Sequence, residues 1–126
     1  MEKTSFNNFN QHLRDRTLTF AVEINALFQS KKISLLNRPM VSQLLRSSSS
    51  VAANFRAATR ARSDAEYYAK ICIVAEECDE TQFWLEYLLK TGVITHQESI
   101  TIRNEAEELV KLFTSIKKKL KDKLQR

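Results

Sequence analysis

The scarcity of turn-forming residues constrains this chain most, because its 126 residues include one glycine and one proline. Sheets need a turn about every ten residues, and turns are built mainly from Gly, Pro, Asn and Asp. All-β and α/β folds are therefore nearly excluded, and long helices remain. A chain of this length buries roughly two-thirds of its unfolded surface. We therefore expect a single all-α domain over residues 1–126, with no need for disulfides or metal.

Apolar periodicity predicts four helices, over about residues 5–30, 40–60, 63–92 and 95–124. The apolar stripe of the first helix is Phe6, Phe9, Leu13, Phe20, Ile24 and Leu27, with Thr17 filling its gap. Capping boxes at Ser63-x-x-Glu66 and Thr95-x-x-Glu98 predict the starts of the last two helices, and Gly92 suits a left-handed helix end between them. Short connections then predict an antiparallel up-and-down four-helix bundle.

A run of four serines, Ser47 to Ser50, interrupts the apolar stripe of the second predicted helix. Serine side chains compete for backbone hydrogen bonds, so the segment would be a mediocre helix in isolation. A flexible linker is the alternative. We favour a helix whose small residues let a neighbouring backbone come close.

The same helix carries a line of polar residues on one face. The line consists of Gln43, Arg46, Ser47, Ser50 and Asn54. If the chain folds back near residue 62, Arg46 lies beside Asp79 or Glu80, and Ser50 lies beside Glu76. We interpret these residues as a semi-buried network that sets helix register or subunit packing. The alternative is a strip of anion-binding arginines, namely Arg46, Arg56, Arg60 and Arg62.

Charge is distributed in blocks. Residues 31–62 hold seven basic residues and no acidic one, residues 64–86 hold seven acidic residues and one lysine, and residues 111–126 hold seven basic residues and one aspartate. The first two blocks can complement each other in neighbouring helices, whereas the last has no evident internal partner. The candidate phosphate-binding residues are Lys117, Lys118, Lys119, Lys121 and Lys123, with Arg60 and Arg62 second.

Three aromatic residues, Phe83, Trp84 and Tyr87, cluster late in the third helix. Their segment is apolar around much of its circumference, which is typical of a helix that is either central or shared with another subunit. We favour the second, because a lone four-helix bundle needs one apolar stripe per helix. We therefore expect these residues to form a homo-oligomer interface.

The sequence offers little to catalysis or metal binding. It has no glycine-rich phosphate loop, and neither histidine lies near a candidate nucleophile in the sequence. A carboxylate-bridged metal site at residues 76–80 is disfavoured because no histidine accompanies these acids. Cys72 and Cys78 lack the paired spacing of a zinc site and fit reduced thiols in a cytoplasmic protein. We expect no catalytic residues, cofactor, signal peptide or membrane span.

Most of the chain resembles a known family, most strongly over residues 43–89. The residues that carry the likeness are Gln43-Leu44-Leu45-Arg46-Ser47, Ser50-Val51-Ala52-Ala53-Asn54, Ala57, Arg62-Ser63, Ala75-Glu76-Glu77, Glu80-Thr81 and Phe83-Trp84-Leu85. Their ordered combination is similar to that of the "four helix bundle protein" family, also called the 23S ribosomal RNA intervening-sequence protein family.

The resemblance implies a left-handed bundle that associates into a ring-like homopentamer without established enzymatic activity. Some members are encoded within insertions in the large ribosomal RNA gene. A related branch comprises the accessory variability proteins of diversity-generating retroelements, which contact nucleic acid and a reverse transcriptase. Many members carry glutamate where this chain has Arg56, so the arginine strip is more basic here.

These observations favour a non-enzymatic, oligomeric helical module that binds nucleic acid, RNA above DNA, through electrostatics. The alternative is a protein-interaction scaffold or accessory subunit whose basic surface meets an acidic protein partner.

Overall fold

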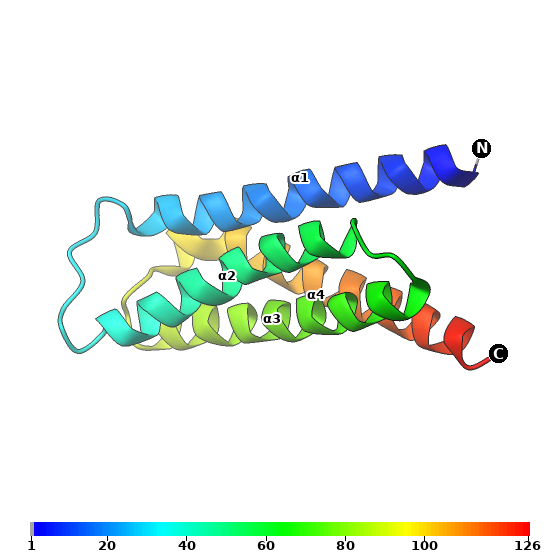
Figure 1. Ribbon diagram of the computed structural model, residues 1–126. Helices are drawn as coiled ribbons and strands as arrows, with labels where there is room; N and C mark the ends of the chain where they lie inside the picture. Colours follow the sequence, from blue (N-terminus) through cyan, green and yellow to red (C-terminus); the bar gives the residue numbers. More distant parts are fainter. Residues whose placement is uncertain (1) are drawn as a thin grey trace.

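The computed structural model describes residues 2–126 as four long helices joined in up-and-down order (Figure 1). These are α1 (Glu2–Phe28), α2 (Arg38–Ala58), α3 (Asp64–Lys90) and α4 (His96–Leu124), and no strand occurs in the described part of the chain. The all-α four-helix bundle predicted from the sequence is confirmed. α2 packs against α1 and α3, α4 packs against α3, and α1 touches α4 more sparsely.

Local side-chain chemistry fixes the helix ends. The Ser63 hydroxyl accepts a hydrogen bond from the Glu66 N–H at the start of α3, and Thr95 forms a reciprocal capping box with Glu98 at the start of α4. Gly92 has φ +79° and follows α3 in a Schellman arrangement, in which the Val93 N–H reaches the Leu88 carbonyl. The two predicted caps, at Ser63 and Thr95, and the predicted helix end at Gly92 are therefore all present.

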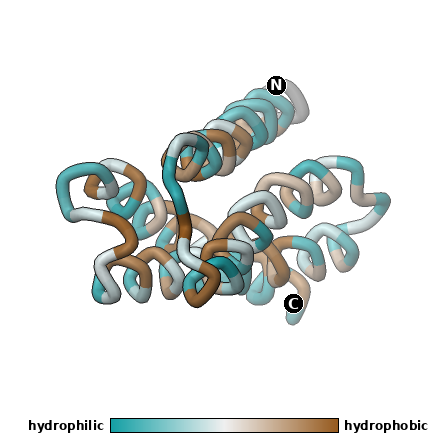
Figure 2. Tube along the Cα trace, turned by 90° about the vertical axis from the view of Figure 1, so that its left-hand side faces the viewer, coloured by the Kyte–Doolittle hydropathy of each residue, from teal (hydrophilic) through white to brown (hydrophobic). Residues whose placement is uncertain are grey.

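The core is formed by one stripe from each helix, and Figure 2 shows apolar residues recurring along every helix. Phe55 of α2 and Phe113 of α4 meet within it, with ring centroids 5.6 Å apart. The serine tract is helical, as predicted, and Ser47 and Ser48 are buried. Small side chains at these two positions therefore lie where α2 contacts its neighbours.

The inward stripe of α1 differs from the sequence-based one near the N-terminus. Phe6 and Phe9 are 49% and 41% exposed, whereas Asn10 is buried. The observed stripe is Asn10, Leu13, Thr17, Phe20, Ile24 and Phe28. The start of α1 extends beyond the end of α2, so few residues cover this part of the helix (Figure 1). Thr17 is buried, and its hydroxyl donates to the Leu13 carbonyl.

Candidate functional site

Two basic segments that are about 55 residues apart in the sequence meet at one end of the bundle. The Nζ atom of Lys123, near the end of α4, lies 3.1 Å from a carboxylate oxygen of Asp64, at the start of α3. Figure 1 shows the α2–α3 connection and the C-terminus at the same end. We call this region the basic end, and it comprises Arg60, Arg62, Lys117, Lys118, Lys119, Lys121 and Lys123.

Most side chains of the basic end are open to solvent. Lys117 is half-buried, and the other six are exposed. Among the described residues, Lys123 is the one member that makes an ion pair. A long cationic side chain that is exposed and unpaired is free to bind an external anion. The basic end therefore has the electrostatic character that phosphate binding requires.

A pocket of about 390 Å³ opens within the basic end. Its lining includes the apolar Ala58 and Leu120 and the cationic Arg62 and Lys123. Phe6, from the start of α1, also lines it. The sequence did not predict this pocket, because the residues that form it come from the ends of four different helices.

On another face, Arg46 of α2 is bound by two carboxylates of α3. Its Nη1 atom donates to Glu77 at 2.8 Å, and its Nη2 atom donates to Glu80. Gln43 accepts from the Nε atom of Arg46 at 3.2 Å. Hydrogen bonds to Glu77 and Glu80 raise the pKa of the guanidinium, so Arg46 is a fixed structural cation.

Of the two carboxylates predicted beside Arg46, the structure brings Glu80 into contact and leaves Asp79 exposed. The predicted position of Glu76 beside Ser50 is wrong, since Glu76 is exposed and Glu77 takes that place. Glu77 and Glu80 lie one turn apart on the α3 face that contacts α2, and the arginine fork spans both. Their i, i+3 spacing was the signal available in the sequence.

Burial by itself raises the pKa of the Glu77 carboxyl, but hydrogen bonds from Arg46 and Ser50 outweigh this effect and leave the pKa lowered. Asn54 belongs to the same polar face and donates to the Ser50 hydroxyl at 2.8 Å. The predicted polar residues of α2 therefore meet Glu77 and Glu80, while Glu76 and Asp79 remain outside the network.

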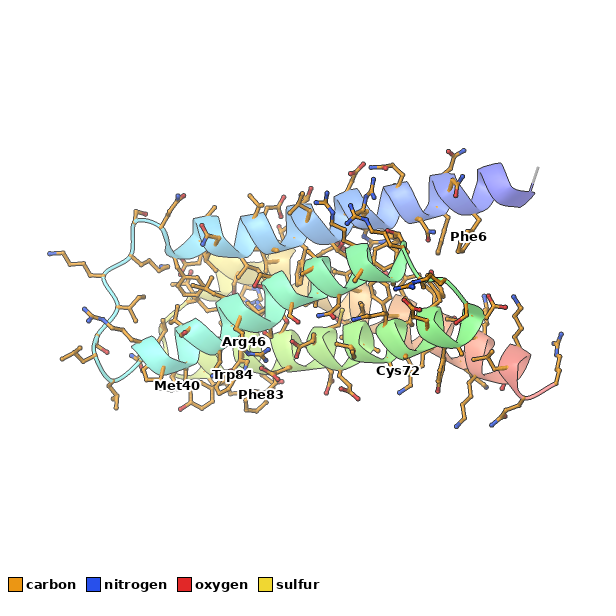
Figure 3. All side chains as sticks on the ribbon, in the orientation of Figure 1. Phe6, Met40, Arg46, Cys72, Phe83 and Trp84 are labelled. Atoms are coloured by element: carbon orange, nitrogen blue, oxygen red, sulfur yellow. The ribbon has the colours of Figure 1, made fainter. Side chains whose placement is uncertain are left out.

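The aromatic patch consists of Phe83, Trp84 and Tyr87 on α3. Its ring centroids lie 4.9 Å (Phe83–Trp84) and 5.5 Å (Trp84–Tyr87) apart. Phe83 is 53% exposed, and the Trp84 indole N–H donates to Glu80 at 3.3 Å. Figure 3 shows Phe83 and Trp84 near Arg46. The patch is thus held in place by the polar network while keeping much of its apolar surface open.

A shallow groove of about 460 Å³ runs between α1 and α2. Small residues of α2, namely Ser49, Ala52 and Ala53, form one side, and Leu18 of α1 lies exposed on the other. Arg14 and Arg56 also line it. The small residues were expected to let a backbone approach closely, but the outward-facing groove was not predicted from the sequence.

Three further features bear on metal binding, thiol chemistry and membrane insertion. No group of three or more His, Cys, Asp or Glu side chains in the described part could hold a metal ion. Cys78 is buried, which raises the pKa of its thiol to about 12, and Cys72 is half-buried. Within residues 2–126, none of the helices is both long and apolar enough to cross a membrane.

Comparison with known proteins identifies relatives of most of the bundle. A family profile described as "23S rRNA-intervening sequence protein" matches residues 10–115. A crystal structure from Bacteroides thetaiotaomicron, described as a protein with unknown function from the S23 ribosomal protein family, is 38% identical with a TM-score of 0.73. The match covers 83% of this chain and 97% of that one. No curated protein matches the chain.

Proposed function

The chain belongs to the 23S rRNA-intervening sequence protein family, and from that premise we propose that it is a non-enzymatic, self-associating helical module that binds RNA through its basic end. One observation carries the proposal: the segment with Arg60 and Arg62 lies at the same end of the bundle as the C-terminal lysines. The ion pair between Lys123 and Asp64 shows this proximity. Two basic segments at one end place several cationic side chains within reach of one phosphate backbone.

The arrangement of charge supports an external partner for the basic end. The acidic residues of α3 neutralise Arg46 through Glu77 and Glu80, far along the bundle from the lysine run. Within the described residues, no ion pair involves Lys118, Lys119 or Lys121. Concentrated positive charge of this kind attracts nucleic acid without reading its sequence.

Filter binding of the full chain to RNA tests the proposal. We expect affinity to fall steeply between low and moderate salt, with a log–log slope of about 0.7 for each neutralised phosphate of a single strand. Protein purified from cells without nuclease should carry excess absorbance at 260 nm. Affinity that does not respond to salt would contradict the proposal, as would an acidic protein that stays bound after nuclease treatment while RNA does not bind.

For self-association, we propose that the aromatic patch of one copy docks in the α1–α2 groove of the next. Asp79 and Glu86 are exposed on α3 about one turn before and after Phe83, whereas Arg14 and Arg56 line the groove. Asp15 also lines the groove, but the two arginines outnumber this carboxylate, so the two surfaces complement each other in charge. Because they are different surfaces, the contact is head-to-tail, and a head-to-tail contact forms a closed ring when its rotation closes.

A further inference from the structure

We propose that the pocket in the basic end is a stacking site for one unpaired RNA base, with Phe6 as the aromatic platform. The inference rests on the proposed function and narrows it from RNA in general to RNA with unpaired nucleotides. Phe6 belongs to neither basic block, so nothing in the charge pattern points to it.

The pocket has the composition of a base-binding site. Its volume is about 390 Å³, and its lining combines apolar side chains, Leu120 among them, with the cationic Arg62 and Lys123. A base that enters a site of this kind buries its faces against apolar groups, while its phosphates remain near cations. Apolar surface combined with flanking positive charge is the pattern of single-strand binding grooves.

Phe6 is positioned to stack on a base, because its side chain is not buried in the core. Its side chain is 49% exposed, and Figure 3 shows it on the side of α1 that faces the rest of the bundle. Its ring packs edge-to-face with Tyr67 of α3, with centroids 5.8 Å apart and an interplanar angle of 62°. This contact orients the Phe6 ring while half of the side chain stays open beside the pocket.

The ionic groups of the pocket favour a nucleotide over a simple anion. Asp64 holds Lys123 at 3.1 Å and adds a carboxylate to the pocket wall. A bare phosphate would be repelled by this carboxylate, whereas a base amino group or a ribose 2′-hydroxyl can donate a hydrogen bond to it. The phosphate groups would then lie toward Arg62 and the exposed lysines.

Stacking in a pocket of this kind requires a base that has left its neighbours. In a duplex the bases are paired and stacked, so their faces do not reach a protein side chain without flipping. We therefore expect the pocket to strengthen binding to single-stranded RNA and to leave duplex binding to the lysines alone.

Fluorescence anisotropy with a labelled 12-nucleotide single-stranded RNA, and with the same sequence in a blunt duplex, tests the proposal on the full chain. The variant is Phe6→Leu, which keeps apolar volume against Tyr67 but removes the aromatic face. The matched control is Phe9→Leu, since Phe9 is a similarly exposed phenylalanine of α1 that does not line the pocket. Because Phe6→Leu removes one base–aromatic stack, we expect it to weaken single-strand binding about tenfold, which corresponds to about 1.4 kcal/mol.

Three results support the proposal together: Phe6→Leu leaves duplex affinity within twofold, Phe9→Leu changes neither affinity, and Phe6→Trp retains single-strand affinity with its indole emission quenched by the RNA. Equal affinities for Phe6→Leu and Phe9→Leu on the single strand would overturn it. If the wild-type chain binds single strand and duplex equally and Phe6→Leu alters neither, the stacking site fails while RNA binding stands. If the wild-type chain binds neither RNA, the proposed function itself fails.

Discussion

The Thr81 hydroxyl of α3 lies 2.9 Å from the Ser47 hydroxyl of α2, and both side chains are fully buried. Thr81 donates to the Ser47 hydroxyl, and Ser47 in turn donates to the Leu44 carbonyl, while the Glu77 carbonyl, 2.7 Å from the Thr81 oxygen, is a second acceptor for the Thr81 hydroxyl. The pair satisfies its polar atoms inside the interface while keeping the side chain on α2 small. Ser47 therefore occupies the α2–α3 interface with a small side chain that is hydrogen-bonded across it.

Ser47→Leu should destabilise the bundle more than Ser47→Ala does. Leucine adds volume to a filled interface, which costs about 1–3 kcal/mol, whereas alanine loses a hydrogen bond worth about 1 kcal/mol. Urea unfolding followed by circular dichroism measures both. The control is Ser42→Leu, because Ser42 is exposed on the same helix and does not line the α1–α2 groove. Equal midpoints for Ser47→Leu and Ser42→Leu would contradict a size limit at this interface.

Acid should destabilise the bundle through Glu77. Its pKa in the folded chain lies below the ordinary value of 4.5, so the folded state binds fewer protons than the unfolded state as this carboxyl titrates. The stabilisation from this group is therefore present above about pH 4.5 and is lost as the pH falls below that value. Glu77→Gln should flatten this part of the pH–stability curve, measured by urea unfolding between pH 3 and pH 7.

Glu76→Gln is the matched control for this experiment, because Glu76 is exposed and Glu77 is the residue that contacts Arg46. We expect the control to retain the acid dependence of the wild type. If the stability of Glu77→Gln still falls with acid as steeply as that of the wild type, other carboxyls determine the acid dependence and the prediction is wrong.

Short-range signals in the sequence were sufficient to predict the helices. Ser63, Gly92 and Thr95 act within one turn of their own positions, so their roles follow from local spacing. The α1 stripe near Phe6 and Phe9 was not predictable in this way, because their exposure depends on where α2 ends. Periodicity gives the apolar face of a helix but does not tell how far a neighbouring helix covers it.

The same distinction applies to the candidate site. The sequence identified Arg46 and the lysines, because charge and helical spacing are visible in it. It placed Arg46 beside Asp79 as readily as beside Glu80. Folding the chain back near residue 62 gives only the approximate height of each residue on the facing helix, and an arginine side chain reaches across a full turn. The pocket beside Phe6 requires the ends of four helices in three dimensions, and no local pattern contains that information.

The aromatic patch should control assembly more than folding. Phe83 and Tyr87 are 53% and 37% exposed, so truncating both to alanine removes little buried surface within one chain. If the patch docks on a second copy, the double variant Phe83→Ala/Tyr87→Ala should shift the mass from light scattering toward a monomer while thermal unfolding changes little.

The control for assembly is Ile73→Ala, since Ile73 is another exposed apolar residue of α3, 38% exposed and outside the patch. We expect it to keep the wild-type mass. A wild-type chain that is monomeric at micromolar concentration would contradict the docking proposal, as would a double variant with unchanged mass.

Removing charge from the basic end should reduce the salt dependence of RNA binding in proportion to the number of phosphate contacts that are lost. Lys119 and Lys121 are exposed near the end of α4, and Lys119→Gln/Lys121→Gln should lower the log–log slope for a single strand by about 1.4. Lys32→Gln/Lys90→Gln removes the same charge from exposed lysines in the α1–α2 connection and at the end of α3, at the opposite end of the bundle (Figure 1). This control should leave the slope close to the wild-type value in filter binding. Equal slopes for the two double variants would mean that RNA responds to net charge alone, and that the gathering of basic segments beside Asp64 does not direct binding.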